Sequence, residues 1–197
     1  MPPAKRSIRA PLSGAHLDRF VRGGTETRTA LYRVAPVRTA ILTVSTSVAA
    51  GDSDDRGGPV LARLAAEAGA DVVAHDVVAD DREAIAERLR AHVRDDVRFV
   101  FTTGGTGLTP DDVTPEATRD VIERDAPGYA EAMRAASVRH TPMGVLSRGV
   151  SGIAGRTLIV NFPGNPPALT QLFPLVAATL VHADQTLSRT GGRAAGA

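Results

Sequence analysis

The sequence predicts an α/β fold with a mostly parallel central sheet and helices on both of its faces. Between residues 37 and 188, short apolar runs rich in β-branched residues alternate with stretches of helical periodicity. The first half of this region has the order β-α-β-α-β, which is typical of parallel strands joined by right-handed crossover helices. Ligands of such sheets bind beyond the carboxyl ends of the strands, so we expect a functional site in the loops that follow them.

The first half supplies three strands and two helices. Residues 38–46 (RTAILTVST), 71–78 (DVVAHDVV) and 97–103 (VRFVFTT) have the composition of strands. Helices are predicted over residues 59–69 and 81–93, because apolar residues recur there at helical spacing. These apolar residues are Leu61, Leu64, Ala65 and Ala68 in the first helix, and Ile85, Leu89 and Val93 in the second.

The second half continues the alternation. The start of its first helix is marked by Thr114 as the N-cap, Pro115 at the first helical position and Glu116 in the first turn. Another helical stretch covers residues 128–138, and residues 157–162 (TLIVNF) form a further buried strand. A last helix is predicted near residues 168–187, and we expect Pro174 to kink or interrupt it.

Length and composition limit the organisation and chemistry. The 197 residues fit one domain, expected over residues 37–188, with a flexible basic arm over 1–36 and a disordered tail over 189–197. The arm could contact nucleic acid or a partner, but its composition favours a solvated extension, and the net charge of +1 gives no general attraction to nucleic acid. Because cysteine is absent, any metal must bind oxygen or histidine ligands. No stretch has the length of a membrane span or the pattern of a secretory signal, so we expect a cytoplasmic location.

The most informative segment is the loop over residues 102–118, TTGGTGLTPDDVTPEAT. Its glycines, Gly104, Gly105 and Gly107, permit positive φ angles and a close approach of backbone N–H groups to a ligand, which suits a phosphate. The loop is not a Walker A motif, because no Gly-Lys-Ser/Thr follows. It is not the dinucleotide fingerprint either, because Pro110 occupies the position of the last glycine.

Two carboxylates, Asp111 and Asp112, stand in the same loop. A carboxylate beside a phosphate is repulsive unless a cation lies between them, so the pair indicates a metal such as Mg²⁺. Capping of a turn or of the helix dipole explains the pair equally well from the residues alone.

Polar residues also follow the other strands. They are Ser45, Thr46 and Ser47, then Asp52, Asp54 and Asp55, then Asp80 and Asp81, and finally Asn161 with the turn over residues 163–166. In a parallel sheet these loops surround one crevice, although polar loops are common at this position in any α/β protein.

These motifs resemble the molybdopterin-binding MoaB/MogA family of molybdenum cofactor biosynthesis. The resemblance covers about residues 38–187 and includes a second long segment, MRAASVRHTPMGVLSRGVSGIAGRTLIVNFPGNP. It implies a three-layer α/β sandwich of the molybdopterin-binding type. It also implies a homotrimer or homohexamer that transfers AMP from Mg·ATP to the terminal phosphate of molybdopterin and releases pyrophosphate, in concert with other proteins of the pathway.

The resemblance also implies roles for single residues. Asp112 and Asp81 match functional carboxylates of the family, and we expect them to be catalytic and to hold Mg²⁺. The residues expected to bind substrate and phosphate are Thr103, Gly104, Gly105, Thr106, Gly107, Ser147, Arg148, Pro163, Gly164 and Asn165. Since a phosphate monoester is already anionic at neutral pH, no histidine or cysteine is needed as a base.

The chain departs from the family pattern at three positions. Asp111 stands where many relatives have Arg, Thr46 replaces an acidic residue, and Gly57 stands where Ser is frequent. Two hypotheses therefore stay open, an adenylyltransferase and a non-catalytic carrier that binds molybdopterin or nucleotide. The presence of both matched aspartates favours the enzyme.

The remaining polar residues carry weaker hypotheses. The histidines show no metal-ligand spacing and no GxSxG motif accompanies them, so surface or packing roles are favoured. Arg134 and Arg139 could line an anionic site, but a solvated helix face is the favoured interpretation. Met133, on the same helix, is interpreted as a core or subunit contact.

Overall fold

The computed structural model describes residues 37–189. The predicted arm lies outside the described residues, as does the predicted tail apart from its first residue. The strands are β1 (Arg38–Val44), β2 (Asp71–Val78), β3 (Phe99–Thr103), β4 (Arg124–Asp125), β5 (Ser151–Ala154) and β6 (Thr157–Phe162). The helices are α2 (Thr46–Ala49), α3 (Gly58–Glu67), α4 (Arg82–Arg94), α5 (Thr114–Arg119), α6 (Gly128–Ser137), the 3-10 helix η2 (Pro142–Leu146) and α7 (Pro166–Leu187).

The strands form one sheet in the order β2-β1-β3-β6-β5-β4. The first four are mutually parallel, whereas β5 pairs with β6 and β4 pairs with β5 in antiparallel fashion. The predicted β-α-β-α-β order and the mostly parallel sheet are therefore confirmed. The antiparallel edge was not predicted, because β4 and β5 are only 2 and 4 residues long.

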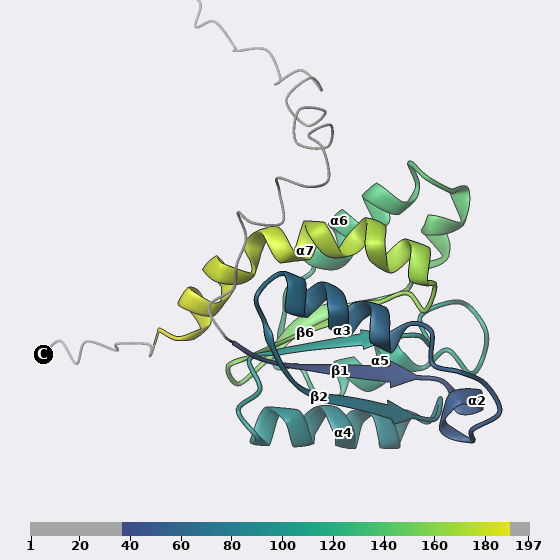
Figure 1. Ribbon diagram of the computed structural model, residues 1–197, viewed down its shortest axis with the longest axis horizontal. Coiled ribbons are helices and arrows are strands. Elements are labelled where there is room, and N and C mark those ends of the chain that lie inside the picture. The colour runs from purple at the N-terminus through teal and green to yellow at the C-terminus, as the bar shows by residue number, and fades with distance from the viewer. Residues whose placement is uncertain (1–36, 190–197) are drawn as a thin grey trace, which may run out of the picture.

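Helices cover both faces of the sheet, which gives the predicted three layers (Figure 1). On one face, α3, α6 and α7 pack on Ile41, Phe101 and other side chains of the strands. On the other face, α4 and α5 pack on the alternate side chains, such as Leu42 and Val100. Each buried strand thus serves two cores, which is why the central strands are apolar along their whole length.

The last helix departs from the prediction. We expected Pro174 to kink or interrupt it, but α7 runs from Pro166 to Leu187 with Pro174 inside, so the interruption is wrong. Proline removes one backbone hydrogen bond at this point. Burial of Phe173 and Val176 on either side of it holds the helix on the sheet and offsets this cost. None of the helices within residues 37–189 is long and apolar enough to span a membrane.

Candidate functional site

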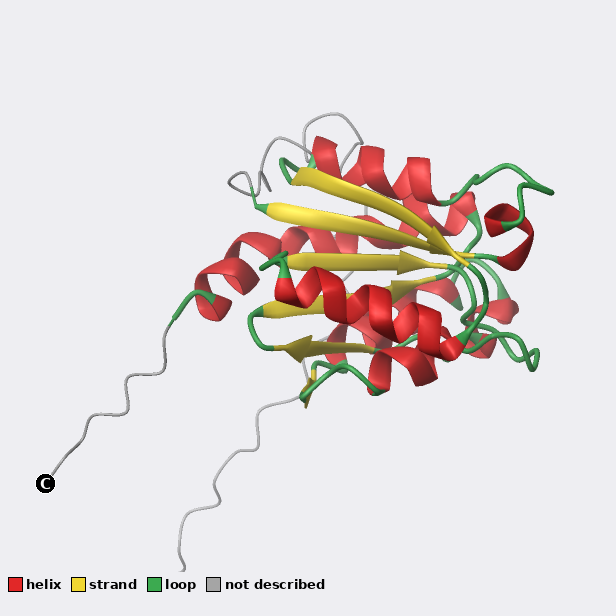
Figure 2. Cartoon of the chain, turned by 90° about the horizontal axis from the view of Figure 1, so that it is seen from below, coloured by secondary structure: helices red, strands yellow, loops and turns green. Residues whose placement is uncertain are grey.

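The loops that follow β1, β2, β3 and β6 all leave the sheet at the same edge. The register places Thr43 beside Thr103, and Thr103 beside Phe162, so these three strands end at one level. Figure 2 shows the arrowheads of the parallel strands pointing to one side, where the loops gather. This is the edge at which the sequence predicted a site.

The loop after β3 contains a backbone cradle that only glycine can form. We call residues 104–107 the glycine loop. Gly104 has φ +103° and Gly105 has φ +60°. A Cβ atom on Gly104 would lie 2.2 Å from the carbonyl oxygen of Val44, and one on Gly105 would lie 2.4 Å from Oγ1 of Thr114. The glycines are therefore required by conformation and by space.

Helix α5 holds the glycine loop in this shape. Thr114 was predicted as the N-cap, but the helix begins at Thr114 itself and Val113 is the capping residue. The hydroxyl of Thr114 instead donates to the carbonyl of Gly104 at 3.0 Å, and its N–H donates to the carbonyl of Gly105 at 3.1 Å. Two successive carbonyls of the loop are thereby fixed from one helix end.

The carboxylate of Asp112 caps the turn that follows the glycine loop. It accepts hydrogen bonds from the N–H of Thr109 at 2.9 Å and from the Thr109 hydroxyl at 2.6 Å. Burial alone would raise the pKa of Asp112. The hydrogen bonds from Thr109 and Gly107 and the charge of Arg148 outweigh burial and lower that pKa. Asp112 is therefore ionised at neutral pH, and its contacts match the turn-capping alternative, whereas its neighbour Asp111 is exposed.

Arg148 binds the protein itself rather than projecting freely into the crevice. Its Nε donates to the carbonyl of Gly107 at 2.7 Å, and its Nη1 donates to Glu116 at 2.6 Å. Its Nη2 donates to the carbonyl of Asp112 and to the second oxygen of Glu116. The hydrogen bond from Arg148 lowers the pKa of Glu116, so the pair stays ionised. We expected Arg148 to bind phosphate, but its donors bind Gly107 of the glycine loop, Asp112 and Glu116. The pairing of Glu116 with Arg148 was not predicted.

The two aspartates after β2 have different roles. The carboxylate of Asp81 accepts from the N–H of Ala84 at 2.8 Å, which makes Asp81 the N-cap of α4. Oδ2 of Asp80 accepts from the N–H of Thr46 at 2.7 Å and from the Thr46 hydroxyl at 2.9 Å. Oδ1 of Asp80 lies 3.2 Å from the position that a Cβ on Gly105 would occupy.

It is thus Asp80, which was expected at this edge of the sheet but was given no catalytic role, whose carboxylate lies against the glycine loop. A usable indication was present in the sequence. Asp81 begins the predicted helical stretch, where aspartate is a preferred N-cap, and this leaves the preceding Asp80 for another role. Thr46, one of the departures from the family pattern, binds this carboxylate.

The turn after β6 and the turn before α3 both lie beside the glycine loop. The hydroxyl of Thr103 donates to the carbonyl of Pro163 at 2.9 Å, and a Cβ on Gly164 would lie 3.4 Å from Cα of Gly104. A Cβ on Gly57 would lie 2.9 Å from the Thr103 hydroxyl. The turn over residues 163–165 therefore packs on the loop as predicted from its place after a parallel strand. Gly57 fits there because it has no side chain.

Another network fixes the start of α3 near this point. Oδ1 of Asp55 accepts from the N–H groups of Gly57 and Gly58 at 3.0 and 2.8 Å. Its Oδ2 accepts from the Thr43 hydroxyl at 2.7 Å and lies 3.0 Å from Nε2 of His75. Burial alone would raise the pKa of Asp55, but these hydrogen bonds and the charge of His75 lower it. The contact of His75 with Asp55 was not foreseen.

A cavity of about 170 Å³ lies next to this group of turns. We call it the α6 cavity, because α6, η2, the start of α7 and the turn after β6 enclose it. Three of the residues expected to bind substrate line it, namely Ser147, Pro163 and Asn165, together with Arg134 and Asn161. The predicted site residues therefore fall into two adjoining parts, the glycine loop with its aspartates and the α6 cavity.

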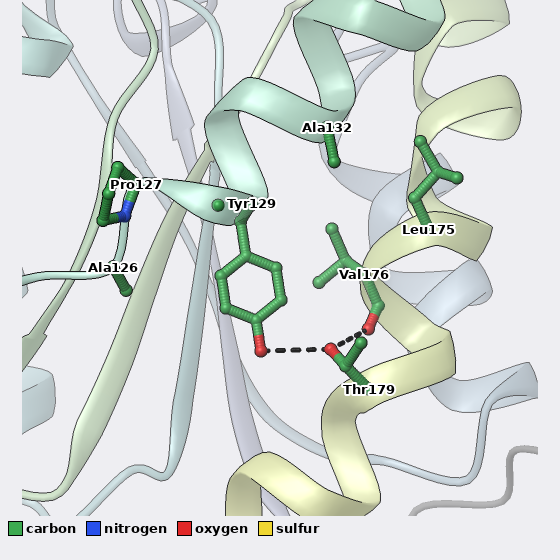
Figure 3. A pocket seen from close by; sticks show the side chains of 8 residues that line it. Ala126, Pro127, Tyr129, Ala132, Leu175, Val176 and Thr179 are labelled. Carbon is green, nitrogen blue, oxygen red and sulfur yellow. Dashed lines mark hydrogen bonds between the residues drawn. The ribbon is translucent and has the colours of Figure 1, made fainter. Parts of the chain in front are cut away.

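A larger pocket, of about 370 Å³, lies elsewhere between α6 and α7 (Figure 3). Its lining is apolar apart from two hydroxyls, and Thr179 donates to the hydroxyl of Tyr129 at 3.0 Å. None of the residues expected at the site lines it. Size alone therefore does not identify the functional site of this chain.

The comparisons with known proteins agree with the geometry. The family described as "Probable molybdopterin binding domain" matches residues 40–183. The chain belongs to this family. The predicted family, its α/β fold and its place in molybdenum cofactor biosynthesis are confirmed.

Curated relatives in this family include the molybdenum cofactor biosynthesis protein B of Escherichia coli K12. It is 42% identical over 135 residues, which are 68% of this chain and 78% of that protein. The molybdopterin adenylyltransferase of Helicobacter pylori J99 is 38% identical over 104 residues, or 52% of this chain and 58% of that protein. Some curated relatives are much longer, so that the chain spans about a quarter of their length.

Among solved structures, the chain is similar to the molybdopterin biosynthesis enzyme MoaB from Thermus thermophilus. The two share 40% sequence identity with a TM-score of 0.73, and the match covers 77% of this chain and 96% of that one. The likeness therefore extends over nearly the whole of the solved protein.

Proposed function

We propose that this chain is a molybdopterin adenylyltransferase, which transfers AMP from ATP to the terminal phosphate of molybdopterin. An oxygen of that phosphate attacks the α-phosphorus of ATP. The bond from the α-phosphorus to the oxygen bridging it to the β-phosphate breaks, and pyrophosphate leaves with the electron pair. The name of the Helicobacter pylori relative supports this activity. The activity also needs no side chain as a general base, because the attacking phosphate is already ionised.

The observation that carries the proposal is the glycine loop with two carboxylates against it. Gly104 and Gly105 have positive φ angles, a conformation that suits backbone N–H groups for binding phosphate, and Asp80 and Asp112 lie against the same loop. Phosphate next to two carboxylates is unfavourable unless a divalent cation separates them. This arrangement fits a nucleotide that brings its own magnesium ion.

The residues present fit such an ion in part. Within residues 37–189, no three His, Cys, Asp or Glu side chains are grouped so that they could hold a metal. Mg²⁺ usually keeps several water ligands and binds one or two carboxylates together with substrate phosphates. We assign those carboxylates to Asp112 and Asp80, and we leave Asp81 to cap α4. When bound, the ion would neutralise phosphate charge during transfer.

The other expected residues fall into supporting roles. The loop over residues 103–107 would hold the phosphates of ATP through its backbone, and Arg148 with Glu116 would keep the loop in shape. Ser147, Pro163, Gly164 and Asn165 would form the part of the site that receives molybdopterin, since three of them line the α6 cavity. Positioning and charge neutralisation then supply most of the rate enhancement.

The test is to incubate the purified chain with molybdopterin, ATP and Mg²⁺ and to follow adenylylated molybdopterin and pyrophosphate by mass spectrometry. Asp112→Ala is expected to abolish product while circular dichroism shows an intact fold. Asp112→Asn is the matched variant, because its amide oxygen can still accept hydrogen bonds from Thr109 but carries no charge. Tight binding of molybdopterin with no product from the unmodified chain would instead favour a carrier protein.

We further propose that the chain acts in the cytoplasm as a homotrimer or homohexamer and passes its product to other proteins of the pathway. Light scattering coupled to size exclusion would measure the oligomeric state directly. Comparing chains with and without residues 1–36, and with and without 189–197, would show whether either terminal segment belongs to the functional unit.

A further inference from the structure

Arg134 is a half-buried cation with an unusual set of contacts. Within residues 37–189, four arginine side chains are neither buried nor fully exposed, namely Arg90, Arg98, Arg134 and Arg148. Three of them lie within salt-bridge distance of a carboxylate. In the described part of the chain Arg134 has no such carboxylate, and its Nη1 donates to the carbonyl of Gly149 at 2.8 Å.

A partly buried charge without a counter-charge is costly, and an anionic ligand would supply the missing opposite charge. The surroundings of Arg134 point to such a ligand. Among the residues that the structure describes, it is the only charged one that lines the α6 cavity. The other polar groups there belong to Ser137, Thr141, Ser147, Asn161 and Asn165.

The position of Arg134 connects the cavity with the glycine loop. Gly149, whose carbonyl Arg134 binds, directly follows Arg148. The backbone N–H of Arg148 donates to the carbonyl of Thr106 in the loop at 2.9 Å. Arg134 is thus joined to the loop by two hydrogen bonds and two residues of chain. Arg148 itself is held by Gly107, Asp112 and Glu116, so it leaves the role of anion ligand to another cation.

We propose that Arg134 binds the terminal phosphate of molybdopterin, the group that accepts AMP. This inference rests on the proposed function. A guanidinium has five N–H donors in a planar fork, and the contact with Gly149 leaves donors free for a bidentate bond to phosphate. Bound in this way, the phosphate lies at the end of the α6 cavity beside the glycine loop, where its oxygen can reach the α-phosphorus of ATP, and the pterin occupies the remainder of the cavity.

The experiment measures binding of molybdopterin without ATP, by fluorescence titration of the full chain. We compare the unmodified chain with Arg134→Gln, Arg134→Lys and the matched control Arg139→Gln, an exposed arginine just beyond the same helix. Loss of a charge-assisted hydrogen bond predicts that Arg134→Gln binds at least about tenfold more weakly. Arg134→Lys keeps the charge and should recover part of the loss, while Arg139→Gln should stay within about twofold, as expected for an exposed charge.

A second ligand separates phosphate binding from a structural role. Molybdopterin from which the phosphate has been removed should bind the unmodified chain more weakly, and Arg134→Gln should cause no further loss with it. The inference is overturned if Arg134→Gln binds phosphorylated molybdopterin as the unmodified chain does. It is also overturned if the variant loses the same factor with both ligands, because Arg134 then acts on the pterin or on the fold. Thermal unfolding of each variant checks that the fold is retained.

Steady-state kinetics distinguish this inference from the proposed function. If transfer occurs, Arg134→Gln should raise KM for molybdopterin and leave KM for ATP unchanged. A chain that binds phosphorylated molybdopterin through Arg134 but forms no product refutes the transferase and keeps the inference. Product formation with an unaltered KM in Arg134→Gln refutes only the inference, and a chain that does not bind molybdopterin refutes both.

Discussion

The adjacent aspartates Asp80 and Asp81 should respond to substitution in opposite ways. Asp81 accepts one hydrogen bond from the N–H of Ala84 at the start of α4, whereas Asp80 lies against the glycine loop. We therefore expect Asp81→Ala to lower stability without impairing transfer, and Asp80→Asn to impair transfer without a comparable loss of stability. Because the residues are neighbours, each variant is the control for the other.

The magnitudes follow from the contacts. Replacing an aspartate N-cap by alanine costs about 1 kcal/mol, in a range of about 0.5–2 kcal/mol. For a domain of this size that corresponds to a fall in Tm of about 2–4 °C. Asn at position 80 keeps an oxygen that can accept from Thr46 but removes the negative charge. Loss of one group that stabilises charge in a transition state lowers kcat by about 100-fold or more.

Two assays on the same preparations test these roles of Asp80 and Asp81. Differential scanning calorimetry gives Tm, and coupled detection of pyrophosphate gives kcat and KM with molybdopterin, ATP and Mg²⁺. Replacing Mg²⁺ by Mn²⁺ adds a readout independent of turnover, since the electron paramagnetic resonance spectrum of Mn·ATP with the protein can be compared with that of Mn·ATP alone. Full transfer activity in Asp80→Asn together with loss of activity in a stable Asp81→Ala would refute the assignment and restore Asp81 as the functional carboxylate.

Three further predictions concern the contacts that hold the site in shape. Gly104→Ala places a Cβ 2.2 Å from the Val44 carbonyl at φ +103°, so thermal unfolding should show a loss of about 2 kcal/mol or more. The control Gly128→Ala, whose Cβ would have no atom of the described residues within 4 Å, should not be destabilised by comparison. Glu116→Gln weakens the hold of Arg148 on the loop and should speed hydrogen exchange of the loop amides, with a change in stability below about 1 kcal/mol for this half-exposed pair; unchanged exchange would argue against the clamp. The pKa of Asp55 is lowered in the folded state, so its stabilising contribution is present above the ordinary aspartate pKa of about 4 and is lost as pH falls through the folded value. Acid unfolding followed by circular dichroism should therefore show a smaller difference in stability between pH 7 and pH 3 in Asp55→Asn, and an equal difference would contradict the assignment.

The fold was predictable where the pattern of apolar residues is local and long. Strand β2 begins and ends at the predicted residues, and α3 and α4 lie close to theirs, because helical spacing and turn residues mark their ends. Strand β1 ends at Val44 rather than Thr46, because Ser45 caps the short helix α2. Strand β5 is held by pairing with β6, and β4 by pairing with β5, and segments as short as these have no periodicity to detect.

The candidate site was predictable only in its backbone. The glycines and the turn after β6 could be placed from sequence, because the residue types report the conformations they permit. Side chains whose partners lie far along the chain could not. Arg148 and Glu116 are 32 residues apart, and Thr46 and Asp80 are 34 apart. In neither pair does the local sequence around one residue indicate its partner.

Arg148 and Arg134 show why the roles of side chains could not be predicted from the sequence. The resemblance assigned Arg148 to phosphate, and the helical pattern favoured solvent for Arg134. In the structure Arg148 is held by the glycine loop and Glu116, while Arg134 lines the α6 cavity. The apolar pattern of α6 correctly predicted that Met133 is buried. It could not predict the surroundings of the neighbouring Arg134, because the element that covers this residue is η2, which folds back over α6 after a turn. A Cβ on Gly144 of η2 would lie 2.7 Å from Ser137, so only glycine permits so close an approach, and it is this approach that encloses the cavity lined by Arg134.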